Sequence, residues 1–252
     1  MKKVSWGEDP EENGPRNFYR ETLIIQSLQR RVKEGIVLDA GCGNGKLTRR
    51  IAKAGYNVEG VDTSKQSIDF LNKKAKQLSI DKKLHAQVGS IFKLPFKKDY
   101  FDGVVCGEVL EHLKEDEKAI KELFRVLKRN GCCVVTVPAK MEKWDSVDDV
   151  SGHIRRYTKE ELREKFEKAG FTVLTSKYWG FPLTNYWHDF IYRPFLERKM
   201  NTGYKVTNSE GVFAKIVKNE HIVTISSLVF HIDTLFDITG LGNSLILVAV
   251  KK

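Results

Sequence analysis

Residues 37–45 read VLDAGCGNG, and this stretch decides how the rest of the sequence is interpreted. Its apolar start predicts a buried strand, and the glycines after it allow a tight turn and close approach of a ligand to the backbone. A dinucleotide-binding loop has the spacing G-x-G-x-x-G and places a pyrophosphate on helix amides. Here the spacing is G-x-G-x-G, and Asp39 ends the strand. Because a carboxylate repels a pyrophosphate and attracts a cation, the loop predicts a positively charged ligand.

A second acid, Asp62, ends the next apolar run, in the sequence GVDTS. In open parallel sheets, ligands bind beyond the carboxyl ends of the strands, and an acid about 20 residues after the glycine turn accepts hydrogen bonds from a ribose. Ser90 and Ile91 follow the third run, where a polar atom and an apolar face can flank an adenine. A cation, a ribose and an adenine together describe S-adenosylmethionine, which carries ammonium and sulfonium groups.

Short apolar runs rich in β-branched residues alternate with segments of helical periodicity. This alternation predicts right-handed βαβ units and a parallel sheet covered by helices on both faces. The predicted strands are 36–39, 57–61, 84–88, 102–106, 132–137, 171–179 and 244–250. The predicted helices are 16–33, 46–54, 64–79, 114–129 and 158–170.

Four segments are predicted along the chain. Residues 1–34 form an N-terminal cap helix region, residues 35–180 the ligand-binding core, residues 181–240 an insertion, and residues 241–252 the final strand of the core. The insertion is far longer than a hairpin connection needs, which indicates that it has a separate function.

The insertion has an unusual composition. Residues 178–200 are rich in Trp, Tyr and Phe with basic residues interleaved, and an apolar series at helical spacing follows at Ile222, Ile225, Val229, Ile232 and Phe236. Three interpretations stay open: a helical lid or dimer contact with its own small core, a pocket for a lipid-like acceptor beside a membrane interface, or a stacking surface for nucleic acid. Nucleic acid is the least favoured partner.

Five motifs in register carry a resemblance to a known family. They are VLDAGCGNG (37–45), GVDTS (60–64), VGSIFKLPF (88–96), YFDGVVCGEVLEHL (100–113) and VLKRNGCCVVTVP (126–138). Over about residues 35–180 the chain resembles the class I S-adenosylmethionine-dependent methyltransferases, and is similar to those of quinone pathways and the cell envelope. The resemblance implies an α/β fold: a Rossmann-like three-layer α/β/α sandwich. Its mostly parallel seven-stranded sheet would have an antiparallel last strand, with a helical insertion between the last two strands.

The resemblance also implies which residues bind the cofactor. In the family, the glycine loop faces the methionyl part, the second acid the ribose, and the residues after the third strand the adenine. Members often carry Asp where this chain has Ser90. The residues implied here are Asp39, Gly41, Cys42, Gly43, Asp62, Thr63, Ser90, Ile91 and Glu108.

Acceptor-side chemistry is expected after the fourth strand, where the chain reads E-V-L-E-H. If this turn is helical, Glu108, Glu111 and His112 lie on one face. His153, in SGHIRRY, matches a motif that borders the acceptor pocket in the same family. Glu111, His112 and His153 are therefore candidate catalytic residues, with a histidine as general base. Alternatively, Glu108, Glu111, His112 and His153 hold Mg²⁺, as in related quinone and RNA O-methyltransferases, or these residues have only structural roles.

Arg155 and Arg156, in the same motif, either bind an anionic acceptor or decorate the start of the next helix. The formal net charge of +10 is spread along the chain rather than gathered in a basic tail. Because no signal-peptide pattern or run of about 20 apolar residues is present, we expect a cytoplasmic protein with reduced cysteines. We expect it to be a monomer or a homodimer. Peripheral membrane contact is compatible with this expectation.

These features predict an enzyme that transfers a methyl group from S-adenosylmethionine to a small or lipophilic acceptor, at oxygen. Two alternatives remain open. One is a Mg²⁺-dependent RNA 2′-O-methyltransferase, and the other is a scaffold that binds S-adenosylmethionine without catalysis.

Overall fold

A seven-stranded sheet runs through the computed structural model, which describes residues 14–201 and 220–252. The strand order is β3-β2-β1-β4-β5-β7-β6. Only β7 runs antiparallel to its neighbours, β5 and β6, which confirms the predicted sheet. The strands are β1 (Ile36–Ala40), β2 (Asn57–Asp62), β3 (Leu84–Val88), β4 (Phe101–Gly107), β5 (Leu127–Pro138), β6 (Phe171–Trp179) and β7 (Ser244–Lys251).

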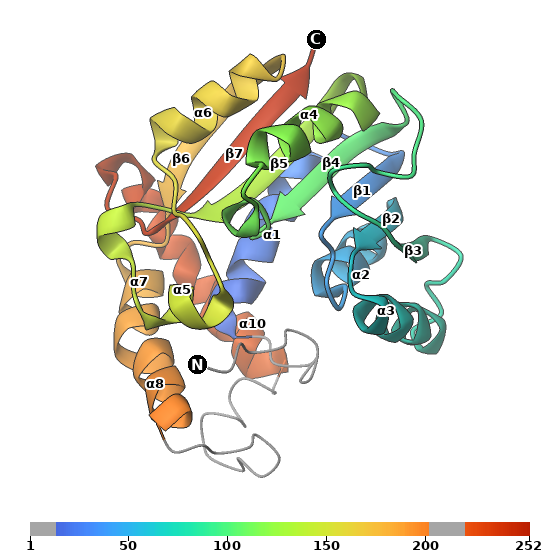
Figure 1. Cartoon of the computed structure of the whole chain (residues 1–252). Helices are drawn as coiled ribbons and strands as arrows, with labels where there is room; N and C mark the ends of the chain where they lie inside the picture. The colour runs from blue at the N-terminus through green and yellow to red at the C-terminus, as the bar shows by residue number, and fades with distance from the viewer. Residues whose placement is uncertain (1–13, 202–219) are drawn as a thin grey trace.

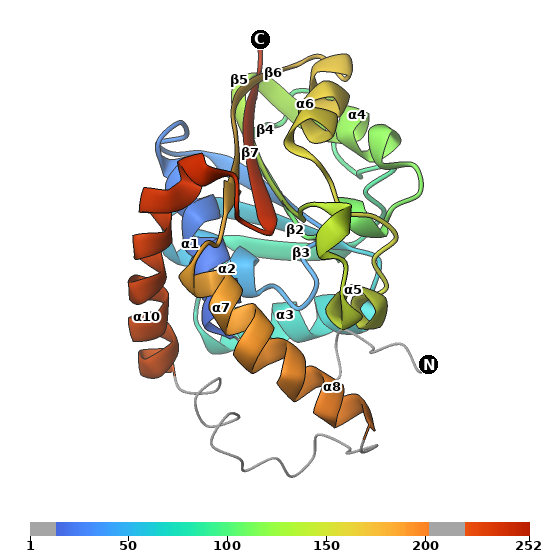
Figure 2. The same ribbon diagram turned by 90° about the vertical axis from the view of Figure 1, so that its left-hand side faces the viewer.

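Helices cover both faces of this sheet and complete the predicted three layers (Figures 1 and 2). On one face lie α1 (Pro15–Gln29), α2 (Lys46–Lys53) and α3 (Lys65–Gln77). On the other lie α4 (Asp116–Val126) and α6 (Lys159–Lys168). Figure 2 shows β7 nearly edge-on, with α1 to one side of it and α4 and α6 to the other.

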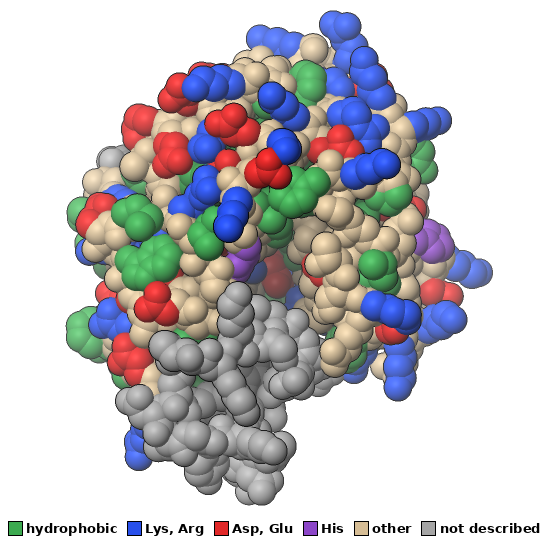
Figure 3. All heavy atoms as spheres, in the orientation of Figure 1, with side chains coloured by type: hydrophobic (Ala, Val, Ile, Leu, Met, Phe, Trp, Pro, Cys, Tyr) green, Lys and Arg blue, Asp and Glu red, His purple; other side chains and the backbone are tan. Residues whose placement is uncertain are grey.

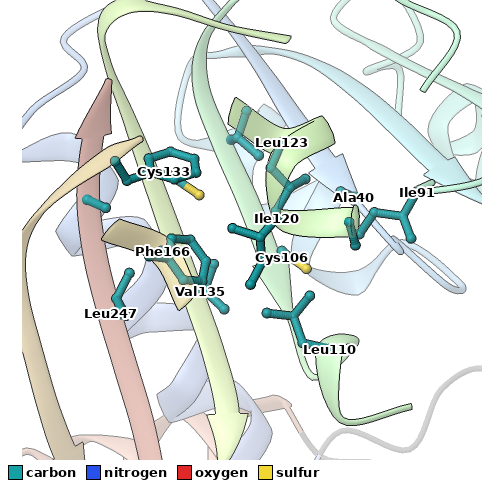
Figure 4. Close-up of a cluster of buried hydrophobic side chains, with 14 of the residues drawn as sticks. Ala40, Ile91, Cys106, Leu110, Ile120, Leu123, Cys133, Val135, Phe166 and Leu247 are labelled. Atoms are coloured by element: carbon teal, nitrogen blue, oxygen red, sulfur yellow. The ribbon is translucent and has the colours of Figure 1, made fainter. Parts of the chain in front are cut away.

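Each face of the sheet has its own apolar core. Figure 4 shows one of the two, where Cys106 and Val135 of the sheet meet Ile120 and Leu123 of α4 and Phe166 of α6. All five side chains are fully buried. Burying such a side chain contributes about 1.5–3 kcal/mol, so these contacts hold the strand ends in fixed positions. All four cysteines are unpaired and buried.

The boundary between α4 and β5 differs from the prediction. The helix was predicted to run to residue 129, but it ends at Val126, and β5 begins at Leu127. Leu127 pairs with Phe101 at the start of β4, so sheet pairing overrides the helical spacing of the apolar residues there. The Asn130-Gly131 pair lies inside this long strand.

The insertion is helical in its described residues. It contains α7 (Leu183–Trp187), a π-helical turn η3 (His188–Tyr192), α8 (Arg193–Asn201), α10 (Glu220–Val229) and a 3-10 helix η5 (Phe230–Thr239). Val223, Ser227 and Phe230 face inward, whereas Ile225, Val229, Ile232 and Phe236 are exposed. The apolar series found in the sequence is therefore not the packed face; the side chain of its first member, Ile222, lies outside the described residues.

Acidic residues of η5 point inward instead. Asp233 is fully buried and accepts hydrogen bonds from the amides of Leu183 and Thr184, at 2.8 and 2.9 Å. This contact joins the two halves of the insertion. Among the described helices, none combines the length and the apolar character needed to cross a bilayer.

Candidate functional site

In the glycine loop after β1, other side chains pack closely against the first and third glycines, whereas the second glycine borders open space. Gly41, Gly43 and Gly45 have φ angles of +80°, +51° and +74°. A Cβ atom at Gly41 would lie 2.5 Å from Val109 Cγ2, and one at Gly45 would lie 2.2 Å from Leu71 Cδ1. A Cβ atom at Gly43 would meet nothing within 4 Å. The backbone of Gly43 is therefore the part of the loop that a ligand can reach.

Asp62 is held beside this opening by two backbone amides. Its Oδ2 accepts a hydrogen bond from the amide of Gly43 at 2.9 Å, and its Oδ1 accepts one from Ser64 at 2.8 Å. A carboxylate has about four acceptor positions, so two remain for ligand hydroxyls. Thr63, the next residue, is exposed at the same strand end.

Asp39, at the end of β1, is almost fully buried. Its Oδ2 accepts a hydrogen bond from the hydroxyl of Thr48 at 2.6 Å. Burial raises the pKa of Asp39 to about 7, and the Thr48 hydrogen bond acts in the opposite direction. The carboxyl group therefore titrates near neutral pH, and a nearby cation would favour its ionised form.

This shift predicts a pH-dependent stability difference between the wild-type protein and Asp39→Asn. Between about pH 4 and pH 7, the folded protein binds a proton at Asp39 that the unfolded chain has released. The free energy of unfolding of the wild type should therefore fall relative to that of the variant, by about 1 kcal/mol per pH unit, and level off above pH 7. Denaturant unfolding at several pH values measures this difference. A flat difference for Asp39→Asn would contradict the buried titration.

Two other predicted cofactor residues are used mainly for packing. Cys42 is buried, and its Sγ would lie 3.1 Å from a Cβ atom placed at Gly60 of β2, so its backbone is the part available to a ligand. Ile91 is 8 % exposed and belongs to the core. The Ser90 hydroxyl accepts a hydrogen bond from the amide of Phe92 at 3.2 Å. The adenine contact at Ser90 and Ile91 stays a prediction.

Glu108 follows β4 with a φ of +56°, a conformation that few residues other than glycine adopt. Its Oε2 lies 3.6 Å from Arg20 Nη1 of α1, while its buried Oε1 has no hydrogen-bond partner among the described residues. Burial raises the pKa of Glu108, but the charges of Arg20 and Arg16 outweigh burial, and the net pKa is lowered. Glu108 is therefore a carboxylate next to Arg20 and within the electrostatic influence of Arg16. The sequence did not point to either arginine.

Glu111, His112 and His153 lie close together, at the 3-10 helix η1 (Leu110–His112) and the loop after α5 (Ser146–Ser151). His153 Nε2 lies 3.8 Å from Glu111 Oε1, and the two histidine ring centroids are 4.8 Å apart. Glu111 is fully buried, and neither of its carboxyl oxygens has a hydrogen-bond partner in the described chain. Burial, and then the charge of Glu108, raise its pKa well above the usual range. Figure 3 shows a hollow near the middle of this face, with histidine and acidic side chains visible inside it.

His153 is oriented by a residue that sequence reasoning missed. Asp148 of α5 accepts a hydrogen bond from His153 Nδ1 at 2.7 Å, which leaves Nε2 as the free nitrogen of the neutral ring. Asp148 is itself held by the guanidinium of Arg156, at 2.6 Å from Nη2. The hydrogen bonds from His153 and Arg156 outweigh burial and lower the pKa of Asp148. Aspartates at positions 145 and 148 form a helix capping box, a sequence signal that could have identified Asp148.

The two arginines of the SGHIRRY motif are both engaged within the protein. Arg155 Nη1 lies 3.0 Å from Asp116 Oδ2, and Arg156 is buried against Asp148. The alternative that these arginines hold an anionic acceptor therefore loses support. Their described partners assign them to fixing the loop that carries His153.

The metal interpretation finds limited support in the donor atoms. Glu111, His112 and His153 each offer one ligand atom within 4.8 Å of the others, and Glu108 is not part of this group. Two imidazole nitrogens and one carboxylate suit transition metals, whereas Mg²⁺ takes oxygen ligands. Because Mg²⁺ fits this donor set poorly, we derive no step through a metal ion.

Comparison with known proteins supplies the family context. Residues 38–135 match the family model described as a methyltransferase domain. A probable S-adenosylmethionine-dependent methyltransferase of Mycolicibacterium smegmatis is 30% identical over 158 residues, which are 62% of this chain and 59% of the relative. A ubiquinone biosynthesis O-methyltransferase of Pelagibacter ubique is 33% identical over 130 residues, 50% of this chain and 53% of the relative. The chain thus spans between half and three-fifths of the length of these relatives.

Solved structures share the fold at low sequence identity. The [4+2]-cyclase SpnF has a TM-score of 0.66 at 21% identity, covering 100% of this chain and 87% of its own. A geranyl diphosphate methyltransferase has a TM-score of 0.62 at 17% identity, covering 94% of this chain and 79% of its own. At these identities the likeness concerns the fold alone.

Proposed function

Because this chain belongs to the class I S-adenosylmethionine-dependent methyltransferases, we propose that it transfers a methyl group from S-adenosylmethionine to a small, lipophilic acceptor. The finer part of the proposal is that the accepting atom is oxygen. When bound, the cofactor supplies a methyl group already activated on a positively charged sulfur. The protein's task is then to hold both partners in line and to accept a proton where the acceptor has one to lose.

One observation carries the cofactor assignment: the Asp62 carboxylate is fixed by the amides of Gly43 and Ser64 next to open space above Gly43. A carboxylate oriented by two amides presents its remaining acceptor positions to a diol. Asp62 would thus bind the ribose hydroxyls. The backbone of Gly43 would lie beneath the ligand, where any side chain would occupy its place.

Charged groups at the ends of β1 and β4 suit the amino-acid end of the cofactor. Asp39 would balance its ammonium group, which would favour the ionised form of a carboxyl whose pKa is near 7. Arg20, whose charge acts on both Asp39 and Glu108, would balance its carboxylate. In a buried site, a zwitterionic amino-acid group requires an opposite charge beside its ammonium group and another beside its carboxylate.

The orientation of His153 supports an oxygen acceptor. Asp148 accepts the Nδ1 hydrogen, so Nε2 is available to take a proton from an acceptor hydroxyl. Glu111 lies 3.8 Å from this nitrogen, and burial raises its pKa. Glu111 would help to hold the imidazole toward the acceptor, so that the ring can act as general base.

The insertion supports a lipophilic acceptor and peripheral contact with a membrane. Its surface exposes Tyr186 and Phe190 of α7 and η3, and a row of apolar side chains on α10 and η5. Exposed apolar patches of this kind mark interaction sites in soluble proteins. We propose that the acceptor is delivered from this side of the molecule.

Transfer of label from S-adenosylmethionine carrying a radioactive methyl group tests the proposal. Incubation with a lipid extract should place the label in the organic phase, in a product whose methyl group is bound to oxygen. The reaction should not depend on added Mg²⁺, because the donor set fits Mg²⁺ poorly. Label found on added RNA, with activity lost in EDTA, would instead support the RNA methyltransferase. Cofactor binding without any transfer would support the scaffold.

A further inference from the structure

Arg16, in the first turn of α1, is a cation with no paired carboxylate among the residues that the structure describes. Its Nη2 donates a 2.6 Å hydrogen bond to the hydroxyl of Ser244, and its guanidinium carbon lies 5.5 Å from the ring centroid of Trp179. Its Nε is buried without a hydrogen-bond partner in the described chain. Within residues 14–201 and 220–252, no carboxylate oxygen lies within 4.0 Å of an Arg16 nitrogen.

The charges around Arg16 do not balance. Arg20 lies against Glu108, and Arg156 lies against Asp148, so each of those arginines has its own carboxylate. Burial lowers the pKa of Arg16, and Arg20 and Arg156 lower it further, while Glu108 acts in the opposite direction. A guanidinium in such surroundings is costly unless an anion joins it. Of these three arginines, Arg16 is therefore the one without a carboxylate of its own among the described residues.

Arg16 lies several strands away from the glycine loop that follows β1. Ser244 begins β7 and pairs with Pro138, at the end of β5, and with Trp179, at the end of β6. In the sheet order, β7 lies three positions from β1, and strands are about 4.8 Å apart, so this point is roughly 14 Å from β1 across the sheet. Arg16 consequently sits at the same strand edge as the glycine loop, on the side where the insertion begins.

Other buried polar groups at this edge also have no partner. Trp179 Nε1, on the residue that pairs with Ser244 across β6 and β7, makes no hydrogen bond with the described residues, and neither does Asn243 Oδ1, on the residue before Ser244. Buried polar atoms in native proteins are normally satisfied, so a cluster of exceptions calls for an explanation. A bound anion that accepts from Arg16 and Trp179 would satisfy the two unpaired donors, whereas Asn243 Oδ1 is an acceptor and needs a donor.

We propose that Arg16 binds an acidic oxyanion, a carboxylate or a phosphate, carried by the methyl acceptor at a point remote from the reacting atom. This inference rests on the proposed function and adds the chemical class of the acceptor. The guanidinium offers the oxyanion its fork of donors, and the indole of Trp179 offers a further donor and an apolar wall. An acceptor with an apolar body and an acidic group would thus be anchored at β7, with its reacting hydroxyl toward His153.

Titration with simple oxyanions tests the proposal without knowledge of the acceptor. Sodium phosphate and sodium benzoate are each added at constant ionic strength, and the midpoint of thermal unfolding is followed to obtain an apparent Kd. We expect at least one of the two to stabilise the wild type, and the better one to identify the acidic group. Arg16→Gln should raise that Kd by about ten-fold or more, and Arg16→Lys should restore part of the affinity. Arg163→Gln on exposed α6, which removes a surface ion pair with Glu167, should leave it unchanged.

Two results would overturn the proposal. One is that neither anion stabilises the wild type, or that either stabilises Arg16→Gln equally well. The other is that Arg16→Gln loses S-adenosylmethionine binding along with anion binding, which would place Arg16 in the cofactor site. Calorimetric titration of the variant with S-adenosylmethionine distinguishes these outcomes from failure of the proposed function, which would show as no cofactor binding in the wild type.

Discussion

Gly43→Leu is expected to lower the affinity for S-adenosylmethionine by about 100-fold or more while the protein still folds. A Cβ atom at Gly43 meets no protein atom within 4 Å, so the leucine side chain would project into the space assigned to the ligand. A left-handed backbone conformation costs an L-residue only about 1–2 kcal/mol, which the domain can tolerate. Calorimetric titration measures the affinity, and thermal unfolding confirms the fold.

Gly55→Leu is the matched control for this substitution. Gly55 also has a positive φ, +107°, and also has open space at its Cβ position, but it lies between α2 and β2 at the opposite end of the strands. The control should therefore lose some stability and keep its affinity. Equal affinity in Gly43→Leu and the wild type would show that the ligand does not lie over Gly43.

Glu111→Leu is expected to abolish most of the activity and to make the protein more stable. Neither carboxyl oxygen of this fully buried side chain has a hydrogen-bond partner in the described chain, so the folded state bears an uncompensated desolvation cost. Replacing the group by an apolar one of similar size should raise the free energy of unfolding by about 1–3 kcal/mol. Since Glu111 lies 3.8 Å from His153 Nε2, turnover should fall by about 100-fold or more.

Glu122→Leu provides the contrast for Glu111→Leu. Glu122 accepts hydrogen bonds from Arg125 and from the amide of Leu94, so its loss should destabilise the protein. Denaturant unfolding and turnover of labelled cofactor measure the two effects separately. A loss of stability in Glu111→Leu, of the same size as in Glu122→Leu, would assign Glu111 a structural role instead.

Local sequence signals were enough for the strands and for the loop after β1, whereas the antiparallel last strand was implied by the family resemblance. Apolar runs of β-branched residues found all seven strands. The signal is clearest in the central strands, which helices bury on both faces, whereas β3 at the sheet edge is largely exposed. Gly41 and Gly45 could be recognised from the G-x-G-x-G spacing. The structure gives the reason for this spacing, since only glycine fits where Val109 and Leu71 approach so closely. Asp62 could be recognised because its place at a strand end follows from the alternation of strands and helices.

Features that depend on distant parts of the chain could not be predicted. Glu108 was expected on one helical face with Glu111 and His112, but its φ of +56° and the short 3-10 turn direct it toward Arg20 instead. The contact of Arg16 with Ser244 joins residues 228 positions apart, and no local pattern announces it. On α10, helical spacing alone could not distinguish a face that packs on α1 from a face left exposed.

The inward acids of the insertion illustrate the same limit. Asp233 occupies a buried position because it accepts the first amides of α7, fifty residues earlier in the chain. Hydrophobic spacing assigns such a residue to the surface and its apolar neighbours to the core. Here the hydrogen-bond requirement of a helix terminus decides the orientation.

A crystal structure of the protein with S-adenosylhomocysteine would test the central claim most directly. We predict that both ribose hydroxyls lie within hydrogen-bond distance of the Asp62 carboxylate and that the amino-acid end lies over Gly43, between Asp39 and Arg20. A ligand bound away from β1 and β2, or with its ribose turned from Asp62, would contradict the account.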